Sequence, residues 1–193
     1  MADENQDMPV IEIENVCKSF HTAAGEVPIL KNVSFKITDG DFLIIYGPSG
    51  SGKSTLLHAL LGLEGPSTGA VKYYGKDIYN GSSEDERGVF RKMHIGMIYQ
   101  QPNWIKCLTV IENVAFPLSL LGMGYSTAYT HAMHILMKLG MQNWANYRPT
   151  ELSSGQQQRI ALARALCHNP YIIVADEPTG NLDFESGQMV MQL

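Results

Sequence analysis

Two stretches near the start of the chain alternate apolar and polar residues. Ile11 and Ile13 belong to the first stretch, and Val33, Phe35 and Ile37 belong to the second. A period of two places the apolar side chains on one face of a strand and the polar side chains on the other. We therefore expect two half-buried strands that pair in antiparallel fashion.

Two later segments are apolar throughout. They cover residues 42–46 and 171–175, and they follow turns at Asp39-Gly40 and Asn169-Pro170. Uninterrupted apolar runs are typical of parallel strands that are buried on both faces. A parallel sheet is therefore expected, and residues 95–99 are predicted to be a further strand.

The segments between these strands have the marks of helices. A helix is predicted from Lys53 to about Leu63, and an edge strand over residues 70–74. Two residue pairs fit the capping box with which a helix opens, Ser83 with Glu86 and Thr109 with Glu112.

Residues 103–158 have a mostly helical pattern. We expect a kink at Pro117, a stop at Gly140 and a break at Pro149. This stretch is interpreted as a helical insert. Its most apolar part, residues 114–123, has only about half the length of a membrane span, so a membrane role would require a partner that crosses the bilayer.

Together these elements predict an α/β fold. Its parts are an N-terminal antiparallel β subdomain, a mostly parallel sheet core and the helical insert. Residues 1–9 are expected to form an acidic flexible tail, and residues 10–193 a single domain. The first eight residues lack the basic and apolar regions of a signal peptide.

The composition argues against several classes of protein. Lys and Arg number 14 and Asp and Glu 19, which gives a net charge of -5. No stretch is basic enough to follow a phosphate backbone, so nucleic acid is not an expected partner. The three cysteines lie far apart at Cys17, Cys107 and Cys167, and we expect reduced thiols in the cytosol.

A glycine-rich loop lies between the first apolar run and the helix that begins at Lys53. Residues 47–54, GPSGSGKS, satisfy the pattern GxxxxGK[ST]. Small residues let backbone N–H groups converge on phosphate oxygens, and the helix adds the positive end of its dipole. Lys53 would reach the β- and γ-phosphates of ATP and Ser54 would ligate Mg²⁺, whereas the alternative is a flexible Gly/Ser loop.

Hydrolysis requires a second carboxylate near the metal and a group that orients water. Asp176 and Glu177 follow the second apolar run and can supply both functions. Asp176 would reach Mg²⁺ through water, and Glu177 would act as general base. Taken alone, the pair would also fit an acidic strand end beside a turn.

The order of the remaining motifs resembles that of ABC-transporter nucleotide-binding domains over nearly the whole chain. Residues 152–159, LSSGQQQR, look like the ABC signature, a glutamine follows the strand 95–99, and GNLD occupies residues 180–183. Residues 175–183 are similar to the branch of lipoprotein-releasing, macrolide-exporting and cell-division ATPases. The expected fold is therefore an ABC-type P-loop NTPase.

The resemblance implies an ATP site that extends beyond the glycine-rich loop. Phe20 matches the aromatic residue that stacks on adenine; the alternative is a core residue. Gln100, or its neighbour Gln101, matches the glutamine that contacts Mg²⁺ and the attacking water. The implied ATP-binding set is Phe20, Gly47, Pro48, Ser49, Gly50, Ser51, Gly52, Lys53, Ser54 and Thr55.

The resemblance also implies partners. The signature residues Ser153, Ser154, Gly155 and Gln156 would cap ATP held by a second subunit, in a head-to-tail dimer, expected to be a homodimer. Asp183 matches the residue through which one site senses the other, and it could also be a helix N-cap. An integral-membrane permease would hold the dimer at the cytoplasmic face of the inner membrane.

Two departures from the family pattern leave other functions open. The family has glycine where Ser154 stands, and its later strand and switch histidine have no counterpart before Leu193. We therefore expect a truncated chain that lacks the C-terminal part of the core, with a sheet edge left uncovered. It would bind MgATP and hydrolyse it slowly or not at all. The alternatives are a non-hydrolysing ATP-binding module and a soluble ABC-type ATPase of DNA repair or translation.

Two further features are discounted as sites. His131 and His134 lie three residues apart on a predicted helix, but no cysteine or carboxylate cluster completes a metal site. The ten methionines, several of them within 133–141, are expected to pack the helical insert.

Overall fold

The structure is a computed structural model that describes residues 9–23, 25–180 and 188. The chain divides into two compact units, residues 1–91 and 92–193. The first unit holds the glycine-rich loop, and the second holds the carboxylates and the signature.

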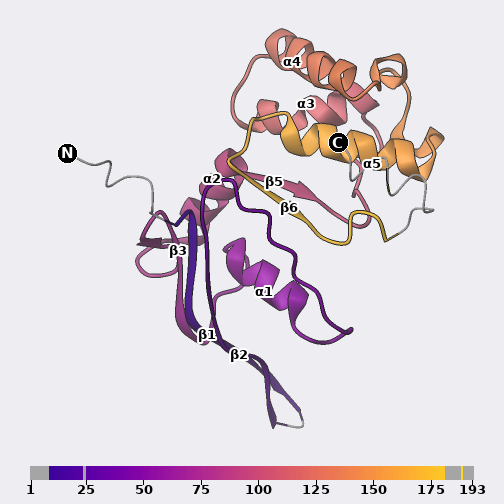
Figure 1. The fold of residues 1–193 in the computed structure, drawn as a ribbon. Helices are drawn as coiled ribbons and strands as arrows, with labels where there is room; N and C mark the ends of the chain where they lie inside the picture. The colour runs from indigo at the N-terminus through magenta and orange to yellow at the C-terminus, as the bar shows by residue number, and fades with distance from the viewer. Residues whose placement is uncertain (1–8, 24, 181–187, 189–193) are drawn as a thin grey trace. The chain divides into compact units, whose positions relative to one another are not determined.

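A four-stranded antiparallel sheet forms the framework of the first unit (Figure 1). Its spatial order is β2-β1-β3-β4, with bounds Ile11–Thr22 for β1, Gly25–Ile37 for β2, Thr68–Tyr73 for β3 and Lys76–Asp77 for β4. In β1 and β2, Ile11 lies opposite Ile37 and Ile13 opposite Phe35. The predicted antiparallel pair is thus confirmed, whereas β3 is not an edge strand because it lies between β1 and β4.

Helix α1 spans Lys53–Leu60 and lies between β2 and β3 in the chain. Helix α2 spans Glu84–His94 and follows β4. The Ser83–Glu86 capping box forms, because the carboxylate of Glu86 accepts hydrogen bonds from the backbone N–H and the hydroxyl of Ser83. The Ser83 hydroxyl in turn accepts from the backbone N–H of Glu86. Helix α2 therefore begins where the sequence predicts.

The expectation of a buried strand over residues 42–46 is wrong in this structure. The segment forms no strand. Phe42 and Tyr46 are 80% and 90% exposed. An apolar run gives a segment the capacity to be a central strand, but a strand exists only when its backbone N–H and C=O groups pair with neighbours.

A two-stranded parallel sheet forms the first part of the second unit. Strand β5 spans Ile95–Ile98 and β6 spans Ile172–Ala175, with Ile95 opposite Ile172 and Ile98 opposite Ala175. The parallel pairing is as predicted. The predicted burial of β6 on both faces is not observed, because Ile173 is 48% exposed. A strand with one neighbour in a small sheet has one face less covered than a central strand does.

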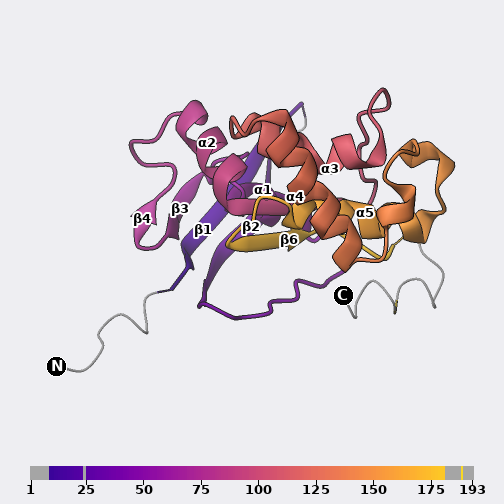
Figure 2. The same ribbon diagram turned by 90° about the horizontal axis from the view of Figure 1, so that it is seen from above.

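A bundle of helices lies in the second unit (Figure 2). Its helices are α3 over Val110–Leu120, α4 over Tyr125–Lys138 and α5 over Ser154–Leu166, with 3-10 turns η1 over Gln142–Trp144 and η2 over Pro149–Glu151. One apolar core joins the three α-helices, built around Val110, Val114, Ala132, Leu136 and Ile160. Helix α3 continues through Pro117, and α4 ends just before Gly140, which has a φ of 67°.

Helix α3 begins with the predicted capping box. The carboxylate of Glu112 accepts from the backbone N–H of Thr109 at 2.7 Å and from its hydroxyl at 2.8 Å. A buried amide then fixes the loop before the helix: the Asn113 side chain accepts from Ile105 N and donates to the carbonyl oxygens of Ile105 and Leu108. Among the described helices, none is long and apolar enough to cross a membrane.

The capping box gives helix α3 a dependence on pH. Hydrogen bonds from the backbone and hydroxyl of Thr109 lower the pKa of Glu112 below its ordinary value. A lowered carboxyl pKa stabilises the folded state at pH values above the unfolded pKa, and this stabilisation is lost as pH falls through the folded pKa. At pH 7 we expect Glu112→Gln to unfold at lower denaturant concentration than wild type, with a smaller difference between the two curves at pH 3 than at pH 7.

Urea titrations followed by circular dichroism at both pH values measure this difference. Glu26→Gln, at an exposed glutamate of β2, is the matched control. An equal gap between Glu112→Gln and wild type at pH 7 and pH 3 would contradict the role of the ionised carboxylate.

Candidate functional site

The glycine-rich loop opens directly into α1. Gly52 is the N-cap residue and lies in the left-handed region with a φ of 92°, and the backbone N–H of Leu56 donates to its carbonyl at 2.8 Å. No side chain caps this helix end, and its first turn contains no acidic residue. The N–H groups of the first turn therefore remain available to an anion, which the helix dipole also favours.

The loop folds around the ammonium group of Lys53. The Nζ atom donates to the carbonyl oxygens of Gly47 at 2.9 Å and Pro48 at 3.1 Å, and the N–H of Ser51 donates to the Pro48 carbonyl at 3.2 Å. A cation held over open backbone amides is suited to bind phosphate oxygens. Ser54 is exposed directly after Lys53, so its hydroxyl is accessible to a metal ion.

Two glycines of the loop lie where a side chain would collide with neighbours. A Cβ atom at Gly52 would lie 3.1 Å from Ile29 Cγ2 and 3.1 Å from Leu30 Cδ2. A Cβ atom at Gly47 would lie 2.9 Å from the Ser51 hydroxyl oxygen. Gly52 is thus needed for the shape of the loop, because its positive φ and these contacts both disfavour a side chain, whereas at Gly47 the Ser51 hydroxyl can rotate away.

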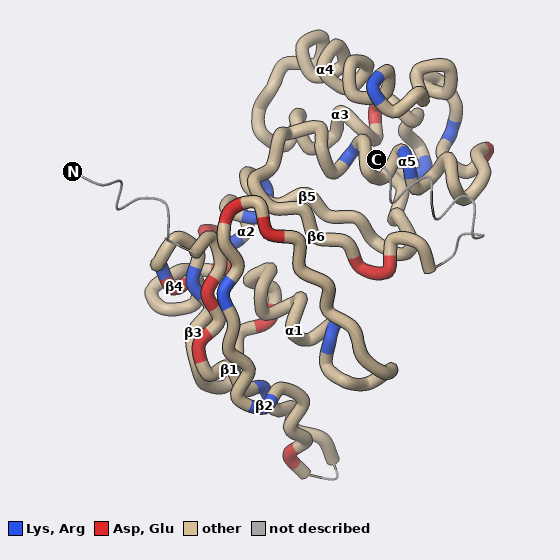
Figure 3. Tube along the Cα trace, viewed as in Figure 1, with Lys and Arg blue, Asp and Glu red and all other residues tan. Residues whose placement is uncertain are grey.

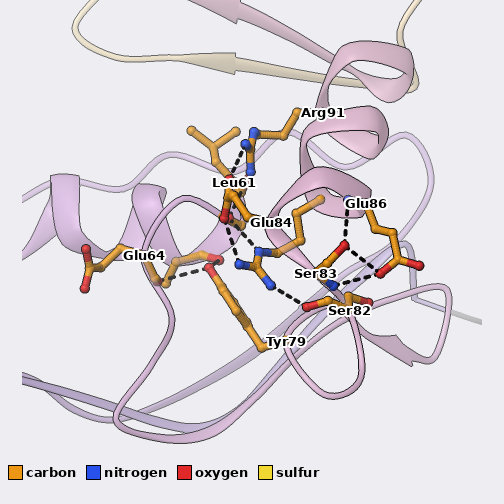
Figure 4. Close-up of polar contacts among 11 residues, drawn as sticks. Leu61, Glu64, Tyr79, Ser82, Ser83, Glu84, Glu86 and Arg91 are labelled. Carbon is orange, nitrogen blue, oxygen red and sulfur yellow. Dashed lines mark hydrogen bonds and ion pairs between the residues drawn. The ribbon is translucent and has the colours of Figure 1, made fainter.

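Side chains donate to carbonyl oxygens at the carboxyl end of α1 and just beyond it, and Figure 4 shows Tyr79 and Arg91 among them. The Tyr73 hydroxyl donates to Leu60 O at 2.7 Å, and the Tyr79 hydroxyl donates to Ala59 O at 2.9 Å. Arg87 and Arg91 donate to the carbonyl of Gly62 at 3.1 and 2.9 Å. We call these four side chains the carboxyl-end clamp.

The clamp is itself supported by an acidic residue. Glu84 accepts from Arg87 and from Arg91, each at 2.7 Å, and these bonds lower its pKa. Burial raises the pKa of Tyr79 to about 12, which keeps its hydroxyl protonated as a donor. Positive charge at this end complements the negative pole of the α1 dipole.

Phe20 lies on β1, opposite Val27 of β2, and its side chain is 38% exposed. The Lys18 ammonium lies 5.1 Å from the centroid of its ring. A partly exposed ring on a strand is accessible to a flat base. Stacking on adenine stays a prediction for this residue.

The carboxylates lie immediately beyond β6, where acidic residues follow the strand (Figure 3). The N–H of Asp176 donates to Ile98 O at 2.9 Å and so continues the pairing with β5. Glu177 then takes a positive φ of 45°, and Gln100 Nε2 donates to Glu177 Oε2 at 3.1 Å. The structure thus brings together two predicted catalytic residues that lie 77 positions apart.

This turn allows a close approach of the glutamine. Gly180 N donates to Glu177 O at 3.0 Å, which closes the turn. A Cβ atom at position 180 would lie 2.9 Å from Gln100 Nε2. Glycine at this place therefore leaves room for the contact between amide and carboxylate.

The signature forms the start of α5. Ser153 is its N-cap, and Ser153 and Gln156 form a reciprocal capping box, with Ser153 N donating to Gln156 Oε1 at 3.0 Å. Ser154 is the first helical residue and is not among the residues with positive φ. Its backbone therefore does not need glycine at this position, and the side chain is exposed.

Comparison with known proteins identifies the family. The family described as ABC transporter matches residues 30–180. This chain belongs to the ABC transporter family. An uncharacterized ABC transporter ATP-binding protein of Methanocaldococcus jannaschii, MJ1508, is 46% identical over 95% of the chain and 82% of its own length.

Two further proteins resemble this ABC cassette. The macrolide export ATP-binding/permease protein MacB of Bdellovibrio bacteriovorus is 44% identical over 95% of the chain, which corresponds to 28% of MacB. The dimeric structure of the cassette MJ0796 is 40% identical with a TM-score of 0.84, over 94% of this chain and 80% of that one. A post-hydrolysis structure of MJ0796 bound to ADP and Pi has the same TM-score and 39% identity.

These findings confirm the predicted fold class, a P-loop ATPase of the ABC type, and the enzyme class, an ABC-type ATPase. The chain is therefore an ATPase cassette of a transporter. Its division into a single domain with an insert over residues 103–158 stays a prediction. Asp183 lies outside the described residues.

Sequence reasoning missed one residue near the catalytic pair. Gln158 is 4% exposed, and its Nε2 donates to Tyr99 O and to Pro178 O. A polar residue on a helix that packs into an apolar core was the only signal in the sequence.

Within the described ranges, no group of His, Cys, Asp and Glu could hold a metal by itself, and this includes His131 and His134.

The glycine-rich loop yields a test of its geometry. We expect Gly52→Ala to weaken MgATP binding at least tenfold, because it combines positive φ with contacts to Ile29 and Leu30. Gly40→Ala is the matched control, since Gly40 also has a positive φ but no atom lies within 4 Å of the added Cβ. Isothermal titration calorimetry with MgATP measures the affinities. Equal affinities for the two variants would show that the crowding at Gly52 is unimportant.

Proposed function

We propose that two copies of this cassette close head to tail on two MgATP molecules, and that hydrolysis opens them to drive a membrane permease. One observation carries the proposal: Gln100 and Glu177 form a 3.1 Å hydrogen bond at the end of β6, directly after Asp176. The uncapped start of α1 beside Lys53 adds the place for the phosphates. The dimer of MJ0796 supports the closed arrangement.

In this proposal Lys53 exchanges its carbonyl partners for the β- and γ-phosphates. Its ammonium already hydrogen-bonds with Gly47 O and Pro48 O, so the positive charge is in place before a nucleotide arrives. The N–H groups from Gly50 to Thr55 surround the remaining phosphate oxygens. Phe20 stacks on the adenine.

Mg²⁺ completes the phosphate chemistry. Oxygen atoms are the ligands that Mg²⁺ prefers, and the ion retains several waters in sites of this kind. The proposed ligands are the Ser54 hydroxyl, the Gln100 side-chain oxygen and, through water, Asp176. The ion neutralises charge between the β- and γ-phosphates when bound.

Glu177 then orients and deprotonates the attacking water. A general base must lie within hydrogen-bonding reach of the proton that it removes, and a partner that fixes its orientation increases the rate. The Gln100 amide is suited to that task because it donates to one carboxylate oxygen and leaves the other available. The partner's signature residues, equivalent to Ser153, Ser154, Gly155 and Gln156, cap the γ-phosphate.

The permease contact is proposed beside Gln100. A groove with a volume of about 520 Å³ lies there, lined by Gln100, Gln101, Pro102, Asn103, Trp104, Lys106, Ser154, Gln157, Gln158 and Pro178. This groove adjoins both the catalytic glutamine and the signature helix, so a partner seated in it would sense both. MacB is named as an ATP-binding and permease protein, which supports this type of assembly. The cytoplasmic face of the membrane is the proposed location.

The two principal roles can be separated by substitution. Lys53→Ala should weaken MgATP binding roughly 10- to 100-fold, because it removes a charged donor to phosphate. Glu177→Gln should retain binding, lower hydrolysis at least about 100-fold and trap a dimer with ATP. Calorimetry and size-exclusion chromatography in MgATP measure these outcomes. Equal loss of binding in both variants would contradict the assigned roles.

The groove gives a second test, on the full-length protein. We expect it to copurify with an integral-membrane protein, and Lys106→Glu to reduce the yield of that complex severalfold. Lys31→Glu, an equal charge reversal at an exposed position of β2, should leave the yield unchanged. A complex without any membrane protein, or equal yields for both variants, would argue against the proposed contact.

A further inference from the structure

The pairing of β5 with β6 stops just before the catalytic pair. Its last residue pair is Ile98 with Ala175, and the final backbone hydrogen bond runs from Asp176 N to Ile98 O at 2.9 Å. Beyond this point both segments leave the sheet as loops. Gln100 and Glu177 lie on these two loops, so the sheet itself does not fix their separation.

A buried glutamine of α5 bridges the two loops where the sheet ends. Gln158 is 4% exposed, and its side-chain Nε2 donates to Tyr99 O at 3.3 Å and to Pro178 O at 2.6 Å. Tyr99 directly precedes Gln100, and Pro178 directly follows Glu177. A primary amide carries two N–H groups, and here each has one of the two carbonyls as its acceptor.

We infer that Gln158 is a positioning residue for hydrolysis, which holds the Gln100 loop and the Glu177 turn at the separation that their hydrogen bond requires. The inference rests on the proposed roles of Gln100 and Glu177. A shift of about 1 Å between catalytic groups can lower a rate about 100-fold. The two bonds of Gln158 act on the backbone next to each catalytic residue, so their loss permits such a shift.

Other side chains of α5 hold the same loop. The Trp104 indole donates to Gln157 Oε1 at 2.8 Å, and the Arg164 guanidinium lies 4.6 Å from the centroid of the Trp104 ring. Arg164 also donates to the carbonyls of Pro102 and Asn103. The loop over residues 99–104 is therefore attached along the length of α5.

This attachment couples the signature to the catalytic pair. The helix that begins with Ser153 and Gln156 is the same 13-residue helix that carries Gln158. A displacement of its first turn is transmitted along the helix, because a hydrogen-bonded helix of this length moves as a unit. Docking of the signature on a partner's nucleotide would thus shift the Gln100–Glu177 geometry of its own subunit through Gln158.

The decisive experiment is Gln158→Met in the full-length protein, with kcat and KM measured for MgATP. Met has nearly the same volume but no N–H donors, so we expect kcat to fall about 10- to 100-fold with KM within about threefold of wild type. Gln142→Met, the same change at an exposed position, should leave both values unchanged. Normal kcat in Gln158→Met would overturn the inference.

A double variant separates positioning from general destabilisation. If Gln158 acts through the catalytic pair, Gln100→Ala with Gln158→Met should hydrolyse ATP within about threefold of Gln100→Ala alone. Multiplicative losses would indicate an independent structural effect and would overturn the inference. Should Gln158→Met not fold, Gln158→Asn takes its place, because its amide is one methylene too short to reach both carbonyls.

A spectroscopic measurement tests the same bridge without turnover. The chain has two tryptophans, so Trp144→Phe leaves Trp104 as the reporter of the loop. We expect Gln158→Met to change Trp104 emission and its response to MgATP, and unchanged spectra would count against the bridge.

If Glu177→Gln fails to trap a dimer, the proposed function itself is wrong. If Glu177→Gln traps a dimer while Gln158→Met hydrolyses ATP normally, only the inference about Gln158 fails.

Discussion

The structure of the nucleotide site depends on helix α1, whose first turn has no side-chain cap and whose last turn is hydrogen-bonded by side chains. At its start, Gly52 and the absence of a side-chain cap leave backbone amides open beside the Lys53 ammonium. At its end, two tyrosine hydroxyls donate to the carbonyls of Leu60 and Ala59, and two guanidinium groups donate to the carbonyl of Gly62 just beyond the helix. The dipole therefore points its unsatisfied positive end at the place where phosphate charge would lie.

Much of this arrangement follows from local patterns in the sequence. The alternation at Ile11 and Ile13 predicts the antiparallel pair, because a period of two needs no information from distant residues. The Thr109–Glu112 box and the glycine-rich loop are equally local, since each is complete within eight residues or fewer. The box and the loop are predictable because their hydrogen bonds close within one segment, whereas for the strands only the alternation of residues is local.

The errors and omissions arise where a feature depends on distant partners. The apolar run 42–46 has the composition of a central strand, yet strand formation requires neighbours that composition does not specify. Similarly, β6 pairs as expected but leaves Ile173 half exposed. Gln158 escaped notice because three successive glutamines give no sign of which one turns inward to bridge two loops.

The carboxyl-end clamp has a consequence for the thermodynamics of nucleotide capture. Helix α1 has eight residues, and isolated helices of that length are marginal in water. Anchoring by Tyr73, Tyr79, Arg87 and Arg91 stabilises this short helix. A preorganised receptor loses less conformational entropy on association, so more of the attraction for the triphosphate is expressed as affinity.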